Sequence, residues 1–192
     1  MLCAPMTLPD IPLSPEAQSF LERIRPRISD GLEAVQRVPV GVLVWGPGVD
    51  STHPLAPVRA NLRTRLRENG HLAVYSEELC DSTLPQSTRI QQLVQAEMFD
   101  LVVSIPATPG SIAEIHDFAA HPRVSSKILV FVNEEHVGGY SENSLRALST
   151  VLTSQVVYYP STDNAGVIER VTLEQVQRVR ELKFMYGWRG DL

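Results

Sequence analysis

The chain has 192 residues, of which 43% are hydrophobic and 20% are charged, as is typical of globular proteins. Its formal net charge of −5 disfavours a nucleic-acid binder that works through a basic surface. No apolar run reaches the roughly 18 residues of a membrane span, and the first residues lack the basic and apolar regions of a secretory signal. We therefore expect a cytoplasmic α/β protein with neither a nucleic-acid nor a membrane partner.

Residues 1–38 are predicted to form an arm followed by a helix. Three prolines within residues 1–13 favour an irregular arm. Ser14 and Pro15 then indicate a helix start, with the serine as N-cap and the proline at the first helical position. Pro26 lies inside the helical pattern and predicts a kink or two short helices. The apolar stripe of this segment consists of Phe20, Leu21, Ile24, Ile28, Leu32 and Val35.

Residues 39–192 are predicted to form one α/β domain around a parallel sheet. Five short apolar runs are continuous rather than alternating, as in strands that are covered on both faces. Apolar residues at helical spacing lie between these runs and after the last one, and they predict helices. The fourth of these helical stripes contains Leu145, Leu148, Val151 and Leu152. We expect a Rossmann- or flavodoxin-like three-layer sandwich with strand order 2-1-3-4-5. The predicted strands are Val40–Trp45, Leu72–Tyr75, Leu101–Ile105, Ile128–Val132 and Val156–Tyr159.

The carboxyl ends of parallel strands are where such sheets bind ligands, so the loops after the strands are the candidate sites. Gly46-Pro47-Gly48 follows the first strand and allows a ligand to approach the backbone closely. It lacks the third glycine of the dinucleotide-binding fingerprint, and a tight turn explains it equally well. Glu77 follows the second strand, where a carboxylate could bind ribose hydroxyls or simply open a helix.

The loop after the third strand is the most specific candidate. Pro109-Gly110-Ser111 begins a helix, whose free amides and serine hydroxyl could bind a phosphate or a sugar. Glu114 lies one turn further on, among apolar neighbours. A carboxylate there is costly without a partner or a function. Ser111 and Glu114 also have the spacing of a capping box, so a capping role and a catalytic or sugar-binding role both remain open.

The glycine-bearing first turn, Asp100 at the start of the third strand and the pattern Gly110-Ser111-x-x-Glu114 resemble the nucleoside 2-deoxyribosyltransferase superfamily, which includes nucleotide N-glycosidases. The resemblance covers about residues 39–160. It implies cleavage of the bond between base and sugar in a small-molecule nucleoside or nucleotide, with Glu114 as the nucleophile. Asp100 matches the acid at the start of the third strand in that family and is interpreted as structural. We expect no cofactor. We expect Glu114 to face a substrate pocket formed by Gly46, Pro47, Gly48, Glu77, Pro109, Gly110 and Ser111.

Gln92 departs from the family pattern, because the transferases carry a second catalytic carboxylate near its position. An amide cannot act as the general acid that protonates a leaving base. Another acid such as Glu77, Glu97 or His116 could replace it. Alternatively, the protein binds or senses a nucleotide derivative without cleaving it.

The histidines, the cysteines and a row of arginines are interpreted as structural or surface residues. The five histidines lack the spacing of metal ligands, and Cys3 and Cys80 form neither a zinc site nor a disulfide framework, so no metal site is expected. Arg59, Arg63 and Arg67 recur every four residues and are interpreted as a solvated helix face, with phosphate steering as the alternative.

A homo-oligomer is expected from spare apolar surface. The first helix carries more apolar side chains than one small sheet is expected to cover, and Tyr186 and Trp188 add aromatic rings near the end of the sequence.

Overall fold

The structure, a computed structural model, describes residues 12–107, 109–139, 142–144, 146–147, 155–161 and 166–187. The chain divides into two compact units, which are residues 1–37 and residues 38–192. The predicted stripe residues Leu145, Leu148, Val151 and Leu152, and the aromatic Trp188, lie outside the described residues.

The described part of the first unit is dominated by helix α1, Pro15–Gln36. Its start is confirmed, since Ser14 Oγ accepts a hydrogen bond from the Ala17 amide at 3.3 Å and a proline opens the helix. The helix continues through Pro26, so the predicted alternative of two short helices is wrong. A proline removes a single backbone hydrogen bond, and the long helical segments on either side of it keep their own. None of the helix's 22 residues is buried.

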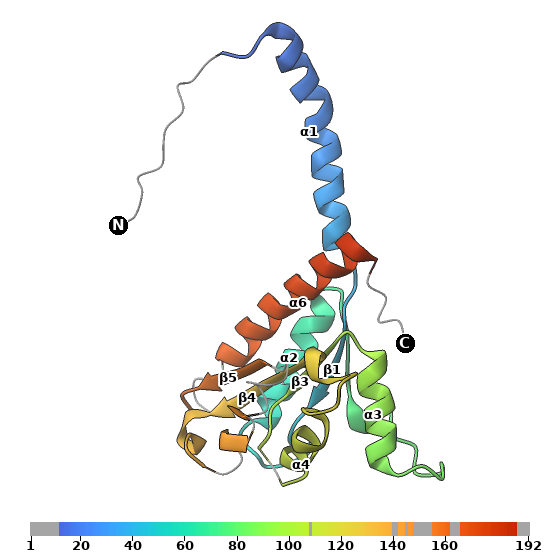
Figure 1. The fold of residues 1–192 in the computed structure, drawn as a ribbon, viewed down its shortest axis with the longest axis vertical. Coiled ribbons are helices and arrows are strands. Elements are labelled where there is room, and N and C mark those ends of the chain that lie inside the picture. Colours follow the sequence, from blue (N-terminus) through green and yellow to red (C-terminus); the bar gives the residue numbers. More distant parts are fainter. Residues whose placement is uncertain are drawn as a thin grey trace. The chain divides into compact units, whose positions relative to one another are not determined.

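The second unit contains the predicted five-stranded parallel sheet in the order β2-β1-β3-β4-β5 (Figure 1). This confirms the fold class and the strand order. The observed strand ends differ from the predicted ones by at most one residue. The strands are β1 Gly41–Trp45, β2 Leu72–Tyr75, β3 Leu101–Ser104, β4 Ile128–Asn133 and β5 Gln155–Tyr159.

Helices cover both faces of the sheet. Helices α2 (Ala56–Glu68) and α6 (Gly166–Tyr186) contribute to a core with one set of strand side chains. Helices α3 (Thr88–Met98) and α4 (Pro109–Phe118) contribute to a second core with the opposite set. Within the described residues, no helix is both long enough and apolar enough to cross a membrane. Short 3-10 helices lie at Ser76–Glu78 (η1), Ser125–Lys127 (η2) and Glu134–His136 (η3).

The strand order reverses between β1 and β3. The chain moves from β1 outward to β2, and then returns across β1 to β3. Trp45 at the end of β1 pairs in register with Ser104 at the end of β3. The loops that follow these strands therefore leave the sheet side by side, at the position where such folds bind ligands.

Asp100 ties the amino ends of two strands to α6. Its Oδ2 atom accepts hydrogen bonds from the Gly41 amide at 2.7 Å and from Lys183 Nζ at 2.6 Å. Lys183 Nζ also donates to the Pro39 carbonyl. Asp100 therefore makes structural contacts at the edge of the sheet opposite the candidate site.

His71 is buried at the same edge and is held in its neutral form. Its Nδ1 atom accepts a hydrogen bond from the Val40 amide at 3.2 Å, and Arg180 Nη2 lies 2.8 Å from Nε2. Burial, reinforced by the positive charges of Arg180 and Lys183, lowers the pKa of His71 to about 4. Protonation would place a proton against the Val40 amide and a positive charge beside Arg180.

Stability is accordingly expected to fall as the pH drops from 7.5 to 5.5. An unfolded histidine binds a proton near pH 6.5 whereas His71 does not, so acid favours the unfolded chain. Between pH 6.5 and the native pKa of about 4, the unfolding free energy falls by up to about 1.4 kcal/mol per pH unit. Urea unfolding of the parent and of His71→Asn, whose Oδ1 can still accept from Val40, measures the effect. The variant should show a flatter pH dependence, and an identical slope would contradict the assignment.

Candidate functional site

Glu114 lies in helix α4, on the side of the sheet that α3 also covers. Because α4 begins at Pro109, Ser111 is its third residue and not its N-cap. The capping-box interpretation of Ser111 and Glu114 is therefore wrong, since that motif requires the serine to precede the helix. Ser111 is buried, and its Oγ accepts a hydrogen bond from the Ala107 amide at 3.0 Å. The serine hydroxyl thus supports the loop that leads into the helix.

The Glu114 carboxylate is partly buried and has a defined partner. Gln92 of α3, itself buried, donates a hydrogen bond from Nε2 to Glu114 Oε1 at 2.6 Å. Burial raises the pKa of Glu114 above its ordinary value, and the charge of Glu77 acts in the same direction. The Gln92 hydrogen bond and the charge of Arg59 oppose that rise. Gln92 and Arg59 thus favour the ionised carboxylate, whereas burial and the charge of Glu77 disfavour it.

Arg59 joins the loops after β1 and β2, although it was not among the predicted site residues. Its side chain is 1% exposed. Nη1 donates to the Pro47 carbonyl at 3.0 Å, and Nη2 donates to the Val44 carbonyl at 2.6 Å. The same two nitrogens bind both carboxylate oxygens of Glu77, at 2.5 and 2.7 Å. The guanidinium thus fixes the first turn and Glu77 in one arrangement.

The interpretation of Arg59 as part of a solvated face is wrong. Leu55, Arg59, Leu62 and Leu66 are separated by four, three and four residues, so Arg59 lies on the apolar face of α2 with the three leucines. All four side chains are buried. The sequence spacing contained this signal, because a charged residue on an apolar stripe needs a buried partner.

The next arginine in the row also binds the segment after β2. Arg63 forms an ion pair with Glu78 at 2.5 Å, and its side chain is 25% exposed. The guanidinium carbons of Arg59 and Arg63 lie 4.2 and 4.0 Å from the centroid of the Tyr75 ring. The hydrogen bond from the Tyr75 amide has the largest effect on the pKa of Glu78 and lowers it; burial opposes that effect, and the contact with Arg63 lowers the pKa further. These contacts hold η1 against α2.

Glu77 therefore occupies the first turn of η1, as the structural alternative expected, and its carboxylate is bound by Arg59. Its side chain is still 51% exposed, and its charge influences the pKa of Glu114. The structure thus brings Glu77, Arg59 and Glu114 into one electrostatic group.

The turn after β1 approaches both α2 and the end of β3. A Cβ atom at Gly46, whose φ is +157°, would lie 3.2 Å from Arg59 Cδ and 3.3 Å from the Ile105 carbonyl oxygen. A side chain at this position would therefore have to displace its neighbours by a few tenths of an ångström. Pro47 is buried and offers its carbonyl to Arg59, whereas Gly48 is exposed with open space around it. Of these three residues, only Gly48 has the room that an approaching ligand needs.

Two of the alternative acids do not have contacts that join them to Glu114. Glu97 lies near the end of α3 that precedes β3, and it pairs with Arg123 at 2.9 Å. That position is at the amino edge of the sheet. His116 lies two residues after Glu114 in α4, and its Nδ1 is 3.5 Å from Ser144 Oγ. Glu77 remains the alternative acid that is electrostatically connected to Glu114.

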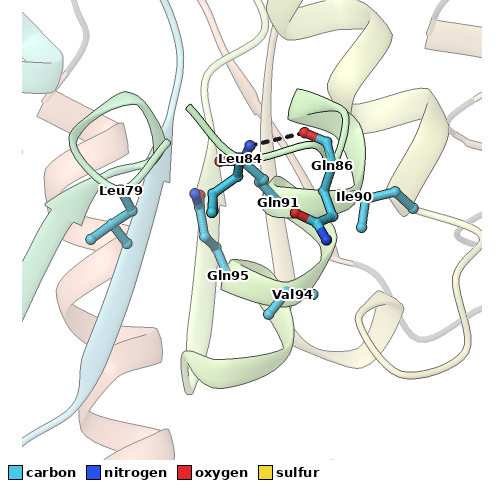
Figure 2. A pocket seen from close by; sticks show the side chains of 7 residues that line it. All are labelled: Leu79, Leu84, Gln86, Ile90, Gln91, Val94 and Gln95. Carbon is cyan, nitrogen blue, oxygen red and sulfur yellow. Dashed lines mark hydrogen bonds between the residues drawn. The ribbon is translucent and has the colours of Figure 1, made fainter. Parts of the chain in front are cut away.

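A surface pocket of about 400 Å³ lies on another side of α3 (Figure 2). Gln91 holds the loop beside it: Oε1 accepts from the Asp81 amide at 2.8 Å, and Nε2 donates to the Gln86 carbonyl at 3.0 Å. None of the predicted site residues lines this pocket. Its lining consists of Leu79, Leu84, Gln86, Ile90, Gln91, Val94 and Gln95.

In the described ranges, no three His, Cys, Asp or Glu side chains are grouped as metal ligands would be. Comparison with known proteins finds no family model that matches the chain and no curated protein that matches its sequence.

Proposed function

We propose that this protein cleaves the N-glycosidic bond of a nucleoside or nucleotide, with Glu114 as the nucleophile. The observation that carries the proposal is the partly buried Glu114 carboxylate, held by Gln92 at 2.6 Å and influenced by the charges of Arg59 and Glu77. Glu114 lies in the helix that follows β3, next to the point where the strand order reverses. Open α/β sheets bind ligands at such points. The sequence around Glu114 resembles the nucleoside 2-deoxyribosyltransferase superfamily.

The reaction would proceed by double displacement. A carboxylate oxygen of Glu114 attacks the anomeric carbon from the face opposite the base, while the C–N bond breaks and its electron pair leaves with the base. Water then attacks the same carbon and loses a proton to the departed base or to the solvent, and this step releases the free sugar and the Glu114 carboxylate. The Gln92 hydrogen bond and the Arg59 charge support the ionised form that this attack requires.

An ordinary leaving base also requires a proton from a general acid. Gln92 contacts Glu114 directly but cannot supply a proton. A test panel should therefore contain ordinary purine and pyrimidine nucleosides and nucleotides, together with pyridinium and N7-methylpurine nucleotides, whose bases leave without protonation. Chromatography that detects the free base is the readout. Release of base from any member supports the proposal, and no release from any member contradicts it.

A binding or sensing module is the second candidate function, and the amide at position 92 favours it. Such a protein would bind a nucleotide derivative without cleaving it. In the same panel, a ligand that raises the melting temperature and stays intact would identify this function.

The pH dependence of cleavage gives a prediction specific to Glu114. Because attack requires the ionised carboxylate and burial raises its pKa, kcat/KM should fall on the acid side with a midpoint above the ordinary glutamate pKa. Gln92→Leu removes a hydrogen bond that lowers the pKa of Glu114, so the midpoint should move to higher pH. Gln86→Leu, an exposed loop change, is the matched control and should leave the midpoint unchanged. A midpoint that does not move in Gln92→Leu would contradict the role of Gln92.

A further inference from the structure

We propose that the site around Glu114 takes a nucleoside or nucleotide whose base already carries a positive charge, such as an N-alkylated pyridine or an N7-alkylated purine. This inference names the substrate class of the proposed N-glycosidase and therefore rests on that function. Two observations carry it. The side chain that contacts Glu114 is an amide rather than an acid, and the exposed charge that influences Glu114 is negative.

The side chains that contact or influence Glu114 are poor proton donors for a leaving base. Gln92 Nε2 donates to Glu114 Oε1 at 2.6 Å, and an amide cannot act as a general acid. Glu77 is the acid whose charge acts on Glu114. Both of its oxygens accept hydrogen bonds from Arg59, at 2.5 and 2.7 Å, as an ionised carboxylate does. Glu77 is therefore held as a base and not as an acid.

Two other candidate acids point elsewhere. His116 is two residues after Glu114 in α4, which places it about 200° around the helix from Glu114. Its Nδ1 atom lies 3.5 Å from Ser144 Oγ. Glu97 is at the amino edge of the sheet, where it pairs with Arg123. A base that leaves without a proton therefore suits this site better than a neutral base does.

The charge around the site also favours a cationic base. The Glu77 side chain is 51% exposed, whereas the Arg59 side chain is 1% exposed and donates to the carbonyls of Val44 and Pro47. A substrate that enters from the solvent therefore meets the negative charges of Glu114 and Glu77 while Arg59 stays covered. A site lined by one sign of charge attracts ligands of the opposite sign.

A cationic base balances the reaction without a general acid. As a Glu114 oxygen bonds to the anomeric carbon, the electron pair of the C–N bond moves onto the ring nitrogen and cancels its positive charge. The base leaves as a neutral molecule, and the glycosyl ester on Glu114 is neutral too. Water then hydrolyses the ester, its proton passes to the solvent, and Glu114 regains its negative charge.

Matched substrates test the substrate class. Guanosine and 7-methylguanosine differ by one methyl group and a positive charge, and they are compared together with uridine, nicotinamide riboside and the 5′-monophosphates of all four. We expect kcat/KM for the cationic members to exceed that for the neutral members by about a hundredfold or more, a typical contribution of a general acid. Comparable rates, or release from neutral members alone, would overturn the substrate class and leave the proposed function standing. No release from any member would overturn both.

Gln92→Glu tests the physical reason for the preference. Two carboxyl groups in hydrogen-bond contact hold a proton to higher pH than either would alone, so the variant carries a proton donor beside Glu114. We expect the ratio of kcat/KM between cationic and neutral members to fall by about tenfold or more. Gln86→Glu adds the same charge in an exposed loop and should keep the parent ratio. An unchanged ratio in Gln92→Glu would overturn the proposal.

Discussion

Glu114→Gln is expected to reduce base release by on the order of a thousandfold or more, because the amide lacks the charge and nucleophilicity of the carboxylate. The fold should persist. The substitution keeps the size of the side chain and removes a partly buried charge, although its contact with Gln92 must rearrange. Rates of base release and melting temperatures, measured on the same preparations, separate loss of catalysis from loss of structure.

Glu97→Gln is the matched control for this experiment. It makes the same chemical change to another shielded, partnered glutamate, which lies at the amino edge of the sheet beside Arg123. Base release should stay near the parent rate. Parent-like turnover in Glu114→Gln would contradict the catalytic assignment.

The second large effect is expected from Arg59→Met, which should destabilise the protein by about 3 kcal/mol. Methionine can fill much of the apolar space of the arginine stem but donates no hydrogen bonds. The carbonyls of Val44 and Pro47 then lose their donor, and Glu77 loses both of its contacts with the guanidinium. Urea unfolding monitored by circular dichroism measures the loss.

Arg65→Met on the same helix provides the comparison. Arg65 is 55% exposed, and its contacts with Glu68 and Glu169 are surface ion pairs. Its replacement should change stability by less than about 1 kcal/mol. Equal losses of unfolding free energy at the two positions would show that the buried contacts of Arg59 stabilise the protein no more than surface ion pairs do.

Glu77→Gln removes the ionic partner of Arg59 but keeps the contacts of Arg59 with the two carbonyls. We therefore expect a smaller loss of unfolding free energy from Glu77→Gln than from Arg59→Met.

The fold could be predicted because the relevant information is local. Each strand is a short apolar run, and α2 is followed by Gly70 at φ +80°, a conformation that glycine adopts readily after a helix. At Pro26 the sequence left a kink and two short helices open, and the second alternative is wrong. Whether a helix continues past a proline depends on the balance between one lost hydrogen bond and the stability of the neighbouring turns, and the spacing of apolar residues does not report that balance.

The loops around the candidate site could be placed from the sequence, but the contacts between its side chains could not. The strand-order rule puts the turn of Gly46 beside the segment that leads into the helix of Glu114. The contact between Gln92 and Glu114 depends on how α3 and α4 pack over the same sheet face, which spacing along the chain does not contain. The position of Arg59 on the leucine stripe of α2 could be predicted from the sequence. Its four hydrogen-bond acceptors could not, because they belong to segments that only the folded chain brings together.

The stereochemistry of the product reports whether a Glu114 oxygen attacks the anomeric carbon. With methanol added to a cleavage reaction of a β-nucleoside or β-nucleotide, the methyl glycoside formed can be identified by NMR. Two successive displacements retain the configuration, so we expect the β-methyl glycoside. An α-methyl glycoside would mean that the solvent attacks the substrate directly, and would contradict a covalent role for Glu114.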